Sequence, residues 1–367
     1  MEKSRKNSID LTLTIAVIGL LAFGCIMVHS AGKYQAKVYY NDEYHYLFKQ
    51  LLGVIFGLFS MFALSFFDYR KLAKMRYVIY GVSIVLLILV FVPGVGVENY
   101  GAKRWIKFPL FTLQSSEIAK VGFVIFASAY MSKNYEKMTT FKGILPVLIS
   151  GGIICVLIIL EPNMSITMCV ALLTFCMLFI GGARIKHFVC IGAPAVLAVP
   201  ALIVAEPYRM KRLLAFLNPW ESPLEEGYQL VQSYYSLGSG GAFGVGLFNS
   251  RQKYLFLPFA ESDFILSIIA EELGWLGCTC LILVYIIVVT RAFRIAKTAS
   301  DRFGSYLAYG IGCLISVQVI INIAVVSGSI PPTGLPLPFI SSGTSSIIAF
   351  CSAIGILNSI KRHGDSH

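Results

Sequence analysis

Long apolar stretches, separated by short polar ones, recur along almost the whole chain of 367 residues. A membrane-spanning helix needs about 20 apolar residues, and we count ten stretches that meet this requirement. Their expected bounds are 11–30, 47–67, 77–95, 115–132, 143–160, 164–182, 188–205, 264–290, 303–327 and 344–360. The pattern therefore predicts an all-α integral membrane protein with ten transmembrane helices, organised as a single membrane domain over residues 1–367.

Three connections between these helices differ from the rest. The longest, residues 206–263, lies between helices 7 and 8 and is too rich in Tyr, Phe, Leu and Trp to be disordered. Its glycine run, residues 238–246, indicates close backbone approach, and no strand–helix unit surrounds it, which excludes a nucleotide-binding loop. Residues 96–114 form a second long connection. Residues 328–343 contain four prolines and no charge, which predicts a non-helical segment that dips back into the bundle.

The charge distribution predicts the orientation. Hydrophobic residues make up 57% of the chain and charged residues 13%, and the formal net charge is +11. Most Lys and Arg lie on short connections, as the preference of basic residues for the cytoplasmic side requires. These connections are the N-terminus, 68–76, 133–142, 183–187, 291–302 and the C-terminal tail. Both termini are therefore expected in the cytoplasm and the 206–263 loop outside, and the basic excess does not indicate nucleic acid.

One ionisable pair lies inside a predicted span. Each such group costs about 2.5–3.5 kcal/mol on insertion scales, so it calls for a reason. Glu117 and Lys120 are three residues apart and share a helix face. One interpretation is a mutual salt bridge that makes the helix insertable. The other is that the pair lines a polar cavity and positions another group, and the two interpretations are compatible.

Four carboxylates occupy residues 257–277, LPFAESDFILSIIAEELGWLG. Glu261 and Asp263 stand at the outer end of the predicted helix. With about 100° per residue, Glu271 lies on a flank of the Asp263 face, and Glu272 points about 180° away from Asp263. Asp263 suits either helix capping or general-base catalysis. Glu271 and Glu272 are expected to contact polar groups of neighbouring helices.

Basic residues also occur in the outer connections, among them Arg104, Arg212 and Lys253. They are expected either to contact anionic headgroups or to hold the pyrophosphate of a phosphorylated lipid. The nine cysteines lie in apolar segments, and none has metal-ligand spacing with histidine. No metal site is therefore expected. A divalent cation is an alternative means of neutralising phosphates, although no ligand cluster in the sequence requires one.

Several runs resemble the SEDS family (shape, elongation, division and sporulation), which includes FtsW, RodA and SpoVE. The runs are GAKRWI…LQSSEIAK (101–120), GYQLVQSYYSLGSGGAFGVGL (227–247), LPFAESDFI…AEELG (257–274) and NIAVVSGSIPPTGLPLPFISSGTSS (322–346). The resemblance covers essentially the whole chain and agrees with ten spans. It implies a peptidoglycan glycosyltransferase of the bacterial cytoplasmic membrane that polymerises lipid II on the outer face together with a class B penicillin-binding protein.

The resemblance also implies roles for individual residues. The family's essential outer-loop aspartate matches Asp263, and its glutamate and lysine on the fourth span match Glu117 and Lys120. Its basic outer segments match Arg104 and Lys253. The chain departs from the family pattern at Ser115 (LQSSE for LQPSE), at Glu161 and Asn163 (EPN for QPD), and at Ser342 and Thr344 (SSGTSS for SYGGSS). No catalytic role is expected at Glu161.

The implied reaction is attack of a lipid II sugar hydroxyl on a lipid-pyrophosphate-linked glycan, with release of undecaprenyl pyrophosphate. Asp263 is then the expected base, Glu117, Lys120 and Glu271 line or support the cavity, and Arg104, Arg212 and Lys253 bind the pyrophosphate. The PPTGLPLPFIS run favours the FtsW-type division members and hence other divisome proteins as partners. The alternatives are an elongation or sporulation role, lipid II transport along the Glu117–Lys120 pair, and a non-enzymatic scaffold.

Overall fold

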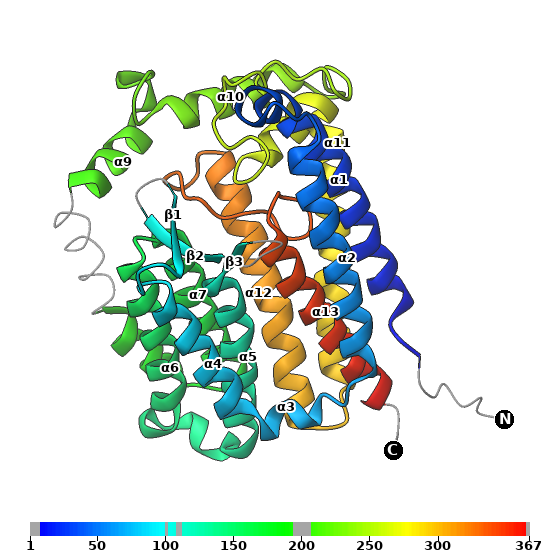
Figure 1. Cartoon of the computed structure of the whole chain (residues 1–367). Helices are drawn as coiled ribbons and strands as arrows, with labels where there is room; N and C mark the ends of the chain where they lie inside the picture. The colour runs from blue at the N-terminus through cyan, green and yellow to red at the C-terminus, as the bar shows by residue number, and fades with distance from the viewer. Residues whose placement is uncertain (1–7, 100–101, 108–111, 194–206, 365–367) are drawn as a thin grey trace.

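Long helices form a bundle, and a layer of short helices and loops covers one end of it (Figure 1). The computed structural model describes residues 8–99, 102–107, 112–193 and 207–364. The helices of the bundle are α1 (Leu11–Tyr40), α2 (His45–Phe66), α4 (Arg76–Leu89), α5 (Ser115–Lys133), α6 (Phe141–Leu160), α7 (Met164–Ile180), α11 (Ile265–Thr298), α12 (Arg302–Val326) and α13 (Thr344–Gly364). The short helix α3 (Arg70–Lys74) connects α2 to α4.

Each of the bundle helices named above overlaps a predicted span, although α1 and α11 continue to Tyr40 and Thr298, beyond the predicted ends at 30 and 290, and α4 ends at Leu89, before the predicted end at 95. Six of them are long and apolar enough to cross a membrane, namely α1, α2, α6, α11, α12 and α13, and α4 and α7 are shorter apolar helices. The chain is thus a multi-pass membrane protein. The remaining predicted span, 188–205, lies largely outside the described residues. Its described part, up to residue 193, belongs to a helical stretch that begins at residue 185.

The bundle has two halves joined at its centre. Helices α4, α6 and α7 lie on one side, and α1, α2, α11 and α13 lie on the other (Figure 1). Helix α12 joins them, because it packs against both α5 and α11, and α13 packs along α2. The start of α1 meets α13, because the main-chain N–H of Asp10 donates to the side-chain oxygen of Asn358 at 3.0 Å.

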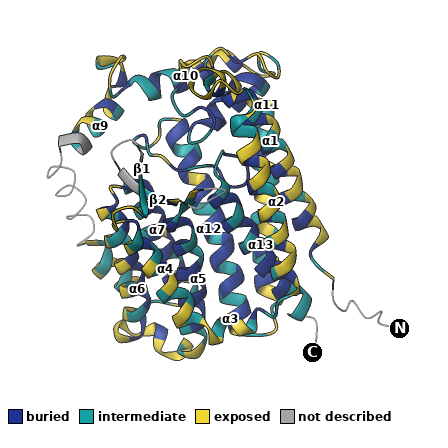
Figure 2. Ribbon diagram, in the orientation of Figure 1, coloured by how far each residue is buried: buried dark blue, intermediate teal, exposed yellow. Residues whose placement is uncertain are grey.

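Capping side chains set the starts of four bundle helices. Asp10, Thr140, Asn163 and Asp301 each accept a hydrogen bond from the main-chain N–H three residues later, at the starts of α1, α6, α7 and α12. Such caps satisfy N–H groups that have no partner within the helix. The outer faces of the bundle helices carry exposed residues (Figure 2). The exposed side chains include Ile15, Ile55 and Phe59, and such an apolar surface suits contact with lipid.

The connections 96–114 and 206–263 are more ordered than the sequence predicts. Residues 96–114 contain an antiparallel sheet of β1 (Gly96–Asn99), β2 (Ala102–Lys107) and β3 (Thr112–Gln114), in the order β1-β2-β3. The expectation of an all-α fold is therefore wrong for this segment. The predicted loop 206–263 contains the helices α9 (Pro207–Leu217) and α10 (Tyr228–Gly240). Strands of three to six residues are too short to give a clear alternating pattern.

Helix α11 is broken at Gly274, whose φ of 68° and ψ of −169° are not helical. The glycine run fills the break. The N–H groups of Val245 and Gly246 donate to the carbonyls of Glu271 and Glu272 at 2.9 and 3.0 Å. A Cβ at Gly244 would lie 2.2 Å from the Glu272 carbonyl oxygen, so this position requires glycine. The predicted close backbone approach of this run is confirmed.

The proline-rich segment 328–343 enters the bundle, as its sequence predicts. Leu335, Leu337, Phe339 and Ile340 are buried. Its main-chain carbonyls accept hydrogen bonds from buried side chains of three helices. These donors are Gln50 to Ile340, Gln318 to Pro336, Asn322 to Leu335 and Tyr285 to Pro338. Non-helical backbone is tolerated at this depth because other protein groups satisfy its polar atoms.

Candidate active site

The backbone around Asp263 is fixed by hydrogen bonds to α12 and to the proline-rich segment. The side-chain amide of Asn322 donates to the Asp263 carbonyl at 3.0 Å and to the Leu335 carbonyl at 2.7 Å. Next to it, Ser341 donates to the Ser262 carbonyl at 2.6 Å. Segments far apart in the sequence therefore hold the residue in one position.

The Asp263 carboxylate lies against Gly334. A Cβ at Gly334 would come within 2.7 Å of the Asp263 Oδ2 atom, so a larger residue here would displace the carboxylate. The helix-capping interpretation of Asp263 is wrong, because the N-cap of α11 is Phe264 and no side-chain hydrogen bond caps this helix. The carboxylate is directed to the proline-rich segment instead.

Two arginines approach the same carboxylate. Arg104 of β2 donates through Nε to the Glu161 carbonyl at 3.2 Å and through Nη2 to the Pro162 carbonyl. Arg212 of α9 donates to the Pro332 carbonyl at 3.3 Å. Each guanidinium is thus anchored by a loop carbonyl.

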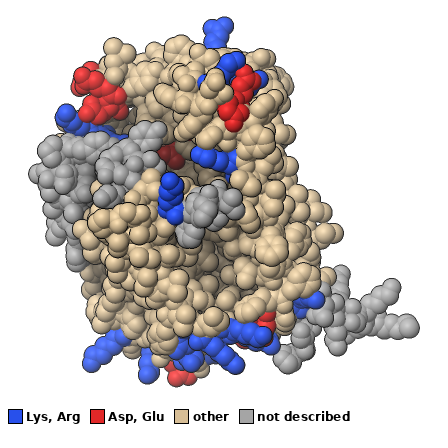
Figure 3. Space-filling view, in the orientation of Figure 1, with Lys and Arg blue, Asp and Glu red and all other residues tan. Residues whose placement is uncertain are grey.

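Burial raises the pKa of Asp263 from its usual value of 3.8 to about 6, whereas the charges of Arg104 and Arg212 act to lower it. The carboxylate is therefore ionised at neutral pH but close enough to neutrality to accept a proton. On the face shown in Figure 3, an acidic group lies deep in a hollow that has Lys or Arg side chains at its edge. An anion next to two cations beside an apolar bundle suits a substrate with a phosphorylated headgroup and a lipid tail.

Comparison with known proteins places the chain in a family. The family model described as "Cell cycle protein", which covers FtsW, RodA and SpoVE, matches residues 11–366. The chain belongs to this family. The predicted SEDS resemblance is therefore confirmed.

Curated relatives in the FtsW/RodA/SpoVE family match over nearly their full lengths. Stage V sporulation protein E of Bacillus subtilis is 38% identical over 98% of this chain and 99% of that protein. A probable peptidoglycan glycosyltransferase FtsW of Francisella salina is 39% identical over 96% of this chain and 89% of that protein.

Solved structures of the same family share the fold. A chain from a structure described as "Structural coordination of polymerization and crosslinking by a peptidoglycan synthase complex" is 26% identical. It has a TM-score of 0.80 and covers 98% of this chain and 99% of its own length. Rod shape determining protein RodA of Thermus thermophilus is 24% identical, with a TM-score of 0.69 over 96% of this chain and 97% of that one.

The predicted pair Glu117 and Lys120 is a buried salt bridge of 2.8 Å. Lys120 also donates to the side-chain oxygen of Gln318, whose amide donates to the Pro336 carbonyl at 2.9 Å. The pair therefore connects α5 through α12 to the proline-rich segment that contacts Asp263. The structure supports the salt-bridge interpretation. The hydrogen bonds through Gln318 also allow the pair to position the site.

Glu271 and Glu272 bind the outer loop that follows the glycine run. Glu271 accepts hydrogen bonds from the side chain of Ser250 and from the main-chain N–H of Arg251, the latter at 2.9 Å. Glu272 pairs with Lys253 at 2.9 Å and accepts from Ser30 of α1 at 2.7 Å. Both acids are structural partners of polar groups, as the sequence predicts, although these groups lie mainly on a loop.

Lys253 lies in this second cluster and not beside Asp263. Its side chain is 6% exposed, and its Nζ atom contacts Glu272 and Ser30. A lysine buried in an ion pair is unsuited to hold a pyrophosphate, because breaking the pair would leave Glu272 buried without its cation. The expectation that Lys253 binds pyrophosphate is corrected accordingly.

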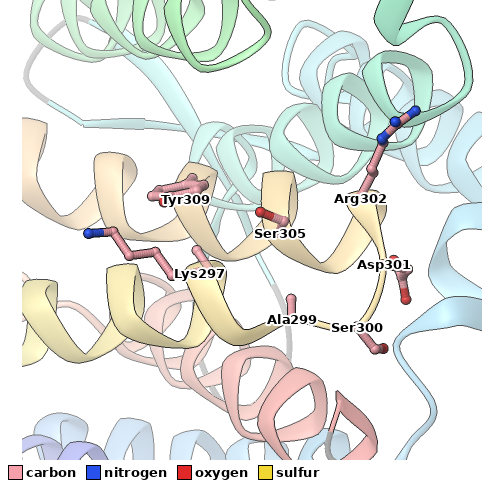
Figure 4. Close-up of a pocket in the computed structure, with 8 residues that line it drawn as sticks. Lys297, Ala299, Ser300, Asp301, Arg302, Ser305 and Tyr309 are labelled. Atoms are coloured by element: carbon pink, nitrogen blue, oxygen red, sulfur yellow. The ribbon is translucent and has the colours of Figure 1, made fainter. Parts of the chain in front are cut away.

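A separate hollow of about 480 Å³ lies where α11 connects to α12. Its lining includes Lys297, Asp301, Arg302 and Tyr309 (Figure 4). Because these residues follow the far end of α11, the hollow is remote from Asp263, which precedes that helix. It does not belong to the candidate active site.

The sequence did not single out Asn322, Gln318 or Gly334, which hold the site. Asn322 and Gln318 are buried polar residues within an apolar helix. Uncharged amides in a predicted span are a usable signal, since an unpaired amide there is costly. No comparable signal marks Gly334, because its role depends on a contact between distant segments.

Proposed function

We propose that this protein is a peptidoglycan glycosyltransferase that polymerises lipid II into β-1,4-linked glycan strands. The names of the curated relatives and the site geometry support this activity. The observation that carries the proposal is the Asp263 carboxylate, whose backbone carbonyl is held by Asn322 and whose charge is influenced by two arginines. This arrangement combines a proton acceptor with cations for a leaving phosphate.

The proposed step begins with the C4 hydroxyl of the incoming lipid II sugar, whose oxygen attacks C1 of the lipid-linked glycan. Asp263 accepts the hydroxyl proton while the bond between C1 and the pyrophosphate oxygen breaks. The bond electrons leave with undecaprenyl pyrophosphate, and inversion at C1 gives the β-1,4 linkage. A sugar hydroxyl is a poor nucleophile, so general-base assistance typically contributes about 10²–10⁴-fold to the rate.

Arg104 and Arg212 stabilise the negative charge that develops on the leaving pyrophosphate. Guanidinium groups suit this role because they remain charged and donate several hydrogen bonds in a fixed geometry. Each arginine is already anchored on a loop carbonyl, so little reorganisation is required during the reaction.

We assign no step to a metal ion. Among the described residues, no group of three or more His, Cys, Asp or Glu side chains is arranged to hold one. The two arginines already provide positive charge near Asp263.

The proposed placement is the bacterial cytoplasmic membrane, with ten transmembrane helices in one domain, both termini in the cytoplasm and residues 206–263 outside. The contact between Asp10 and Asn358 supports an even number of crossings. The gathering of Lys and Arg at the end of the bundle where α3 lies supports the orientation (Figure 3). Asp263 then faces the outer side.

The proposed partners are lipid II, the lipid-linked glycan, a class B penicillin-binding protein and, for a division role, other divisome proteins. The similarity to a chain of a complex that combines polymerization and crosslinking supports a transpeptidase partner. Relatives named for division and for sporulation are similarly identical, at 39% and 38%. We expect a fluorescent fusion at the septum of growing cells, and labelling along the lateral wall would favour elongation.

The deciding experiment supplies labelled lipid II and the penicillin-binding protein to wild-type protein and to Asp263→Asn. We expect polymer from the wild type and little from the variant. If the wild type makes no polymer but moves lipid II across vesicles, the transport alternative replaces the enzyme. If Asp263→Asn polymerises normally, the base is assigned wrongly.

A further inference from the structure

A second carboxyl group lies near Arg104 and has no part in the proposed reaction. Glu161, which ends α6, is 1% exposed. Its Oε1 atom accepts one long hydrogen bond, of 3.4 Å, from Ser115. Its Oε2 atom has no hydrogen-bond partner among the described residues. A buried carboxylate with so few partners is costly, whereas the protonated form is much less so.

The backbone of Glu161 accepts a hydrogen bond from Arg104, and the charge of Arg104 also acts on the Glu161 side chain. The Glu161 carbonyl accepts from Arg104 Nε at 3.2 Å, and the Arg104 charge acts on the Glu161 carboxyl group. The same guanidinium acts on Asp263. Arg104 is therefore shared between two acids, one of which is the proposed base.

The electrostatics assign the two acids different states. Burial raises the pKa of Glu161 to about 8, and Arg104 and the Ser115 hydrogen bond only partly oppose this effect. The charged groups in the first two turns of the adjacent helix α5, Glu117 and Lys120, are paired with each other, and Lys133 lies at the far end of that helix. At neutral pH, Asp263 is thus ionised and Glu161 is protonated.

We propose that Glu161 is a positioning residue that, in its neutral form, leaves the charge of Arg104 available to the pyrophosphate of the substrate. This inference rests on the proposed function. When Glu161 loses its proton, its carboxylate attracts the guanidinium and competes with the pyrophosphate. Ionisation therefore weakens substrate binding without removing the base.

The test compares wild type with Glu161→Gln between pH 7 and pH 9.5, measuring KM and kcat separately with labelled lipid II. Glutamine has the shape of the protonated acid and cannot ionise. We expect the wild-type KM to rise above about pH 8, by up to roughly tenfold per pH unit, and the KM of the variant to stay flat. At pH 7 the two proteins are expected to have similar KM values.

The control is Glu225→Gln, which changes an exposed glutamate shortly before α10 and is expected to follow the wild-type profile. Binding of inorganic pyrophosphate to the detergent-solubilised proteins, followed over the same pH range, gives a readout that does not need catalysis. If the wild type makes polymer, and Glu161→Gln shows the same rise in KM and the same pyrophosphate binding profile, the proposed role of Glu161 is wrong. The proposed function then still stands. Absence of polymer from the wild type at pH 7 contradicts the proposed function, and the binding profiles still test Glu161.

Discussion

The side chain of Asn322, buried in α12, donates a 3.0 Å hydrogen bond to the main-chain carbonyl of Asp263. The same amide donates to Leu335 at 2.7 Å, so one side chain ties the backbone of the proposed base to the proline-rich segment. Catalysis depends on such placement, because small displacements of a reacting group lower the rate strongly.

Asn322→Leu is expected to lower kcat by roughly 10- to 100-fold, since loss of a buried hydrogen-bond donor costs about 1–3 kcal/mol. Steady-state polymerisation, corrected for the fraction of folded protein, measures this effect. The control is Asn358→Leu, which removes another buried amide that bonds to Asp10 and Thr14 at the other end of the bundle. It should lower the melting temperature with little change in kcat. Equal loss of kcat in both variants would contradict a specific role for Asn322.

Proton transfer to Asp263 predicts an acidic limb in the pH profile. The pKa of this group is raised to about 6, and the base acts only when deprotonated. Activity should therefore rise as pH rises through about 6 and level off before the proposed ionisation of Glu161 raises KM above about pH 8. Because Arg104 and Arg212 act to lower this pKa, replacing either by glutamine should move the limb to higher pH.

The pH dependence of kcat/KM for Arg212→Gln checks the second part of this prediction. Lys211→Gln is a matched control, because Lys211 is the adjacent residue on α9 and its side chain is 67% exposed. It should leave the limb in place. A limb that does not move in Arg212→Gln would separate this arginine from Asp263.

The Glu117–Lys120 pair should be far more sensitive to single than to double substitution. Replacing Lys120 by Met leaves Glu117 buried without its cation, a change that typically costs about 3–5 kcal/mol. Adding Glu117→Gln removes the uncompensated charge and should recover much of the stability. Thermal unfolding in detergent measures both, and a double variant as unstable as the single one would contradict this prediction.

Gly244→Ala should destabilise the protein strongly. The added Cβ would lie 2.2 Å from the Glu272 carbonyl oxygen, and the φ of +80° disfavours any other residue. The matched control is Gly241→Ala, where φ is +53° and nothing lies within 4 Å. With ψ at −147° its cost is limited to backbone strain, about 1–3 kcal/mol. Unfolding midpoints that fall equally in both variants would show that contact with the α11 break is unimportant.

The spans could be predicted because lipid and protein interior both select apolar residues, so even buried helices such as α12 carry a continuous apolar signal. The structure of the layer of short helices and loops that covers one end of the bundle could not be predicted. Its strands are short, and Lys253 pairs with Glu272, 19 residues later on α11, through a loop whose path the sequence does not indicate. A helical wheel of α11 gives no information on which loop side chains meet its acids. Asp263 was identified through family resemblance, whereas its supports Asn322 and Gly334 required the fold.

The hydrogen bond between Asp10 and Asn358 joins the start of α1 to α13, the last helix of the bundle. The first bundle helix, α1, and the last, α13, both pack against α2 and α11. The packing of these helices therefore does not require that α1 comes first in the chain. A circularly permuted gene that joins the two ends by a flexible linker and opens the chain elsewhere should therefore encode the same bundle.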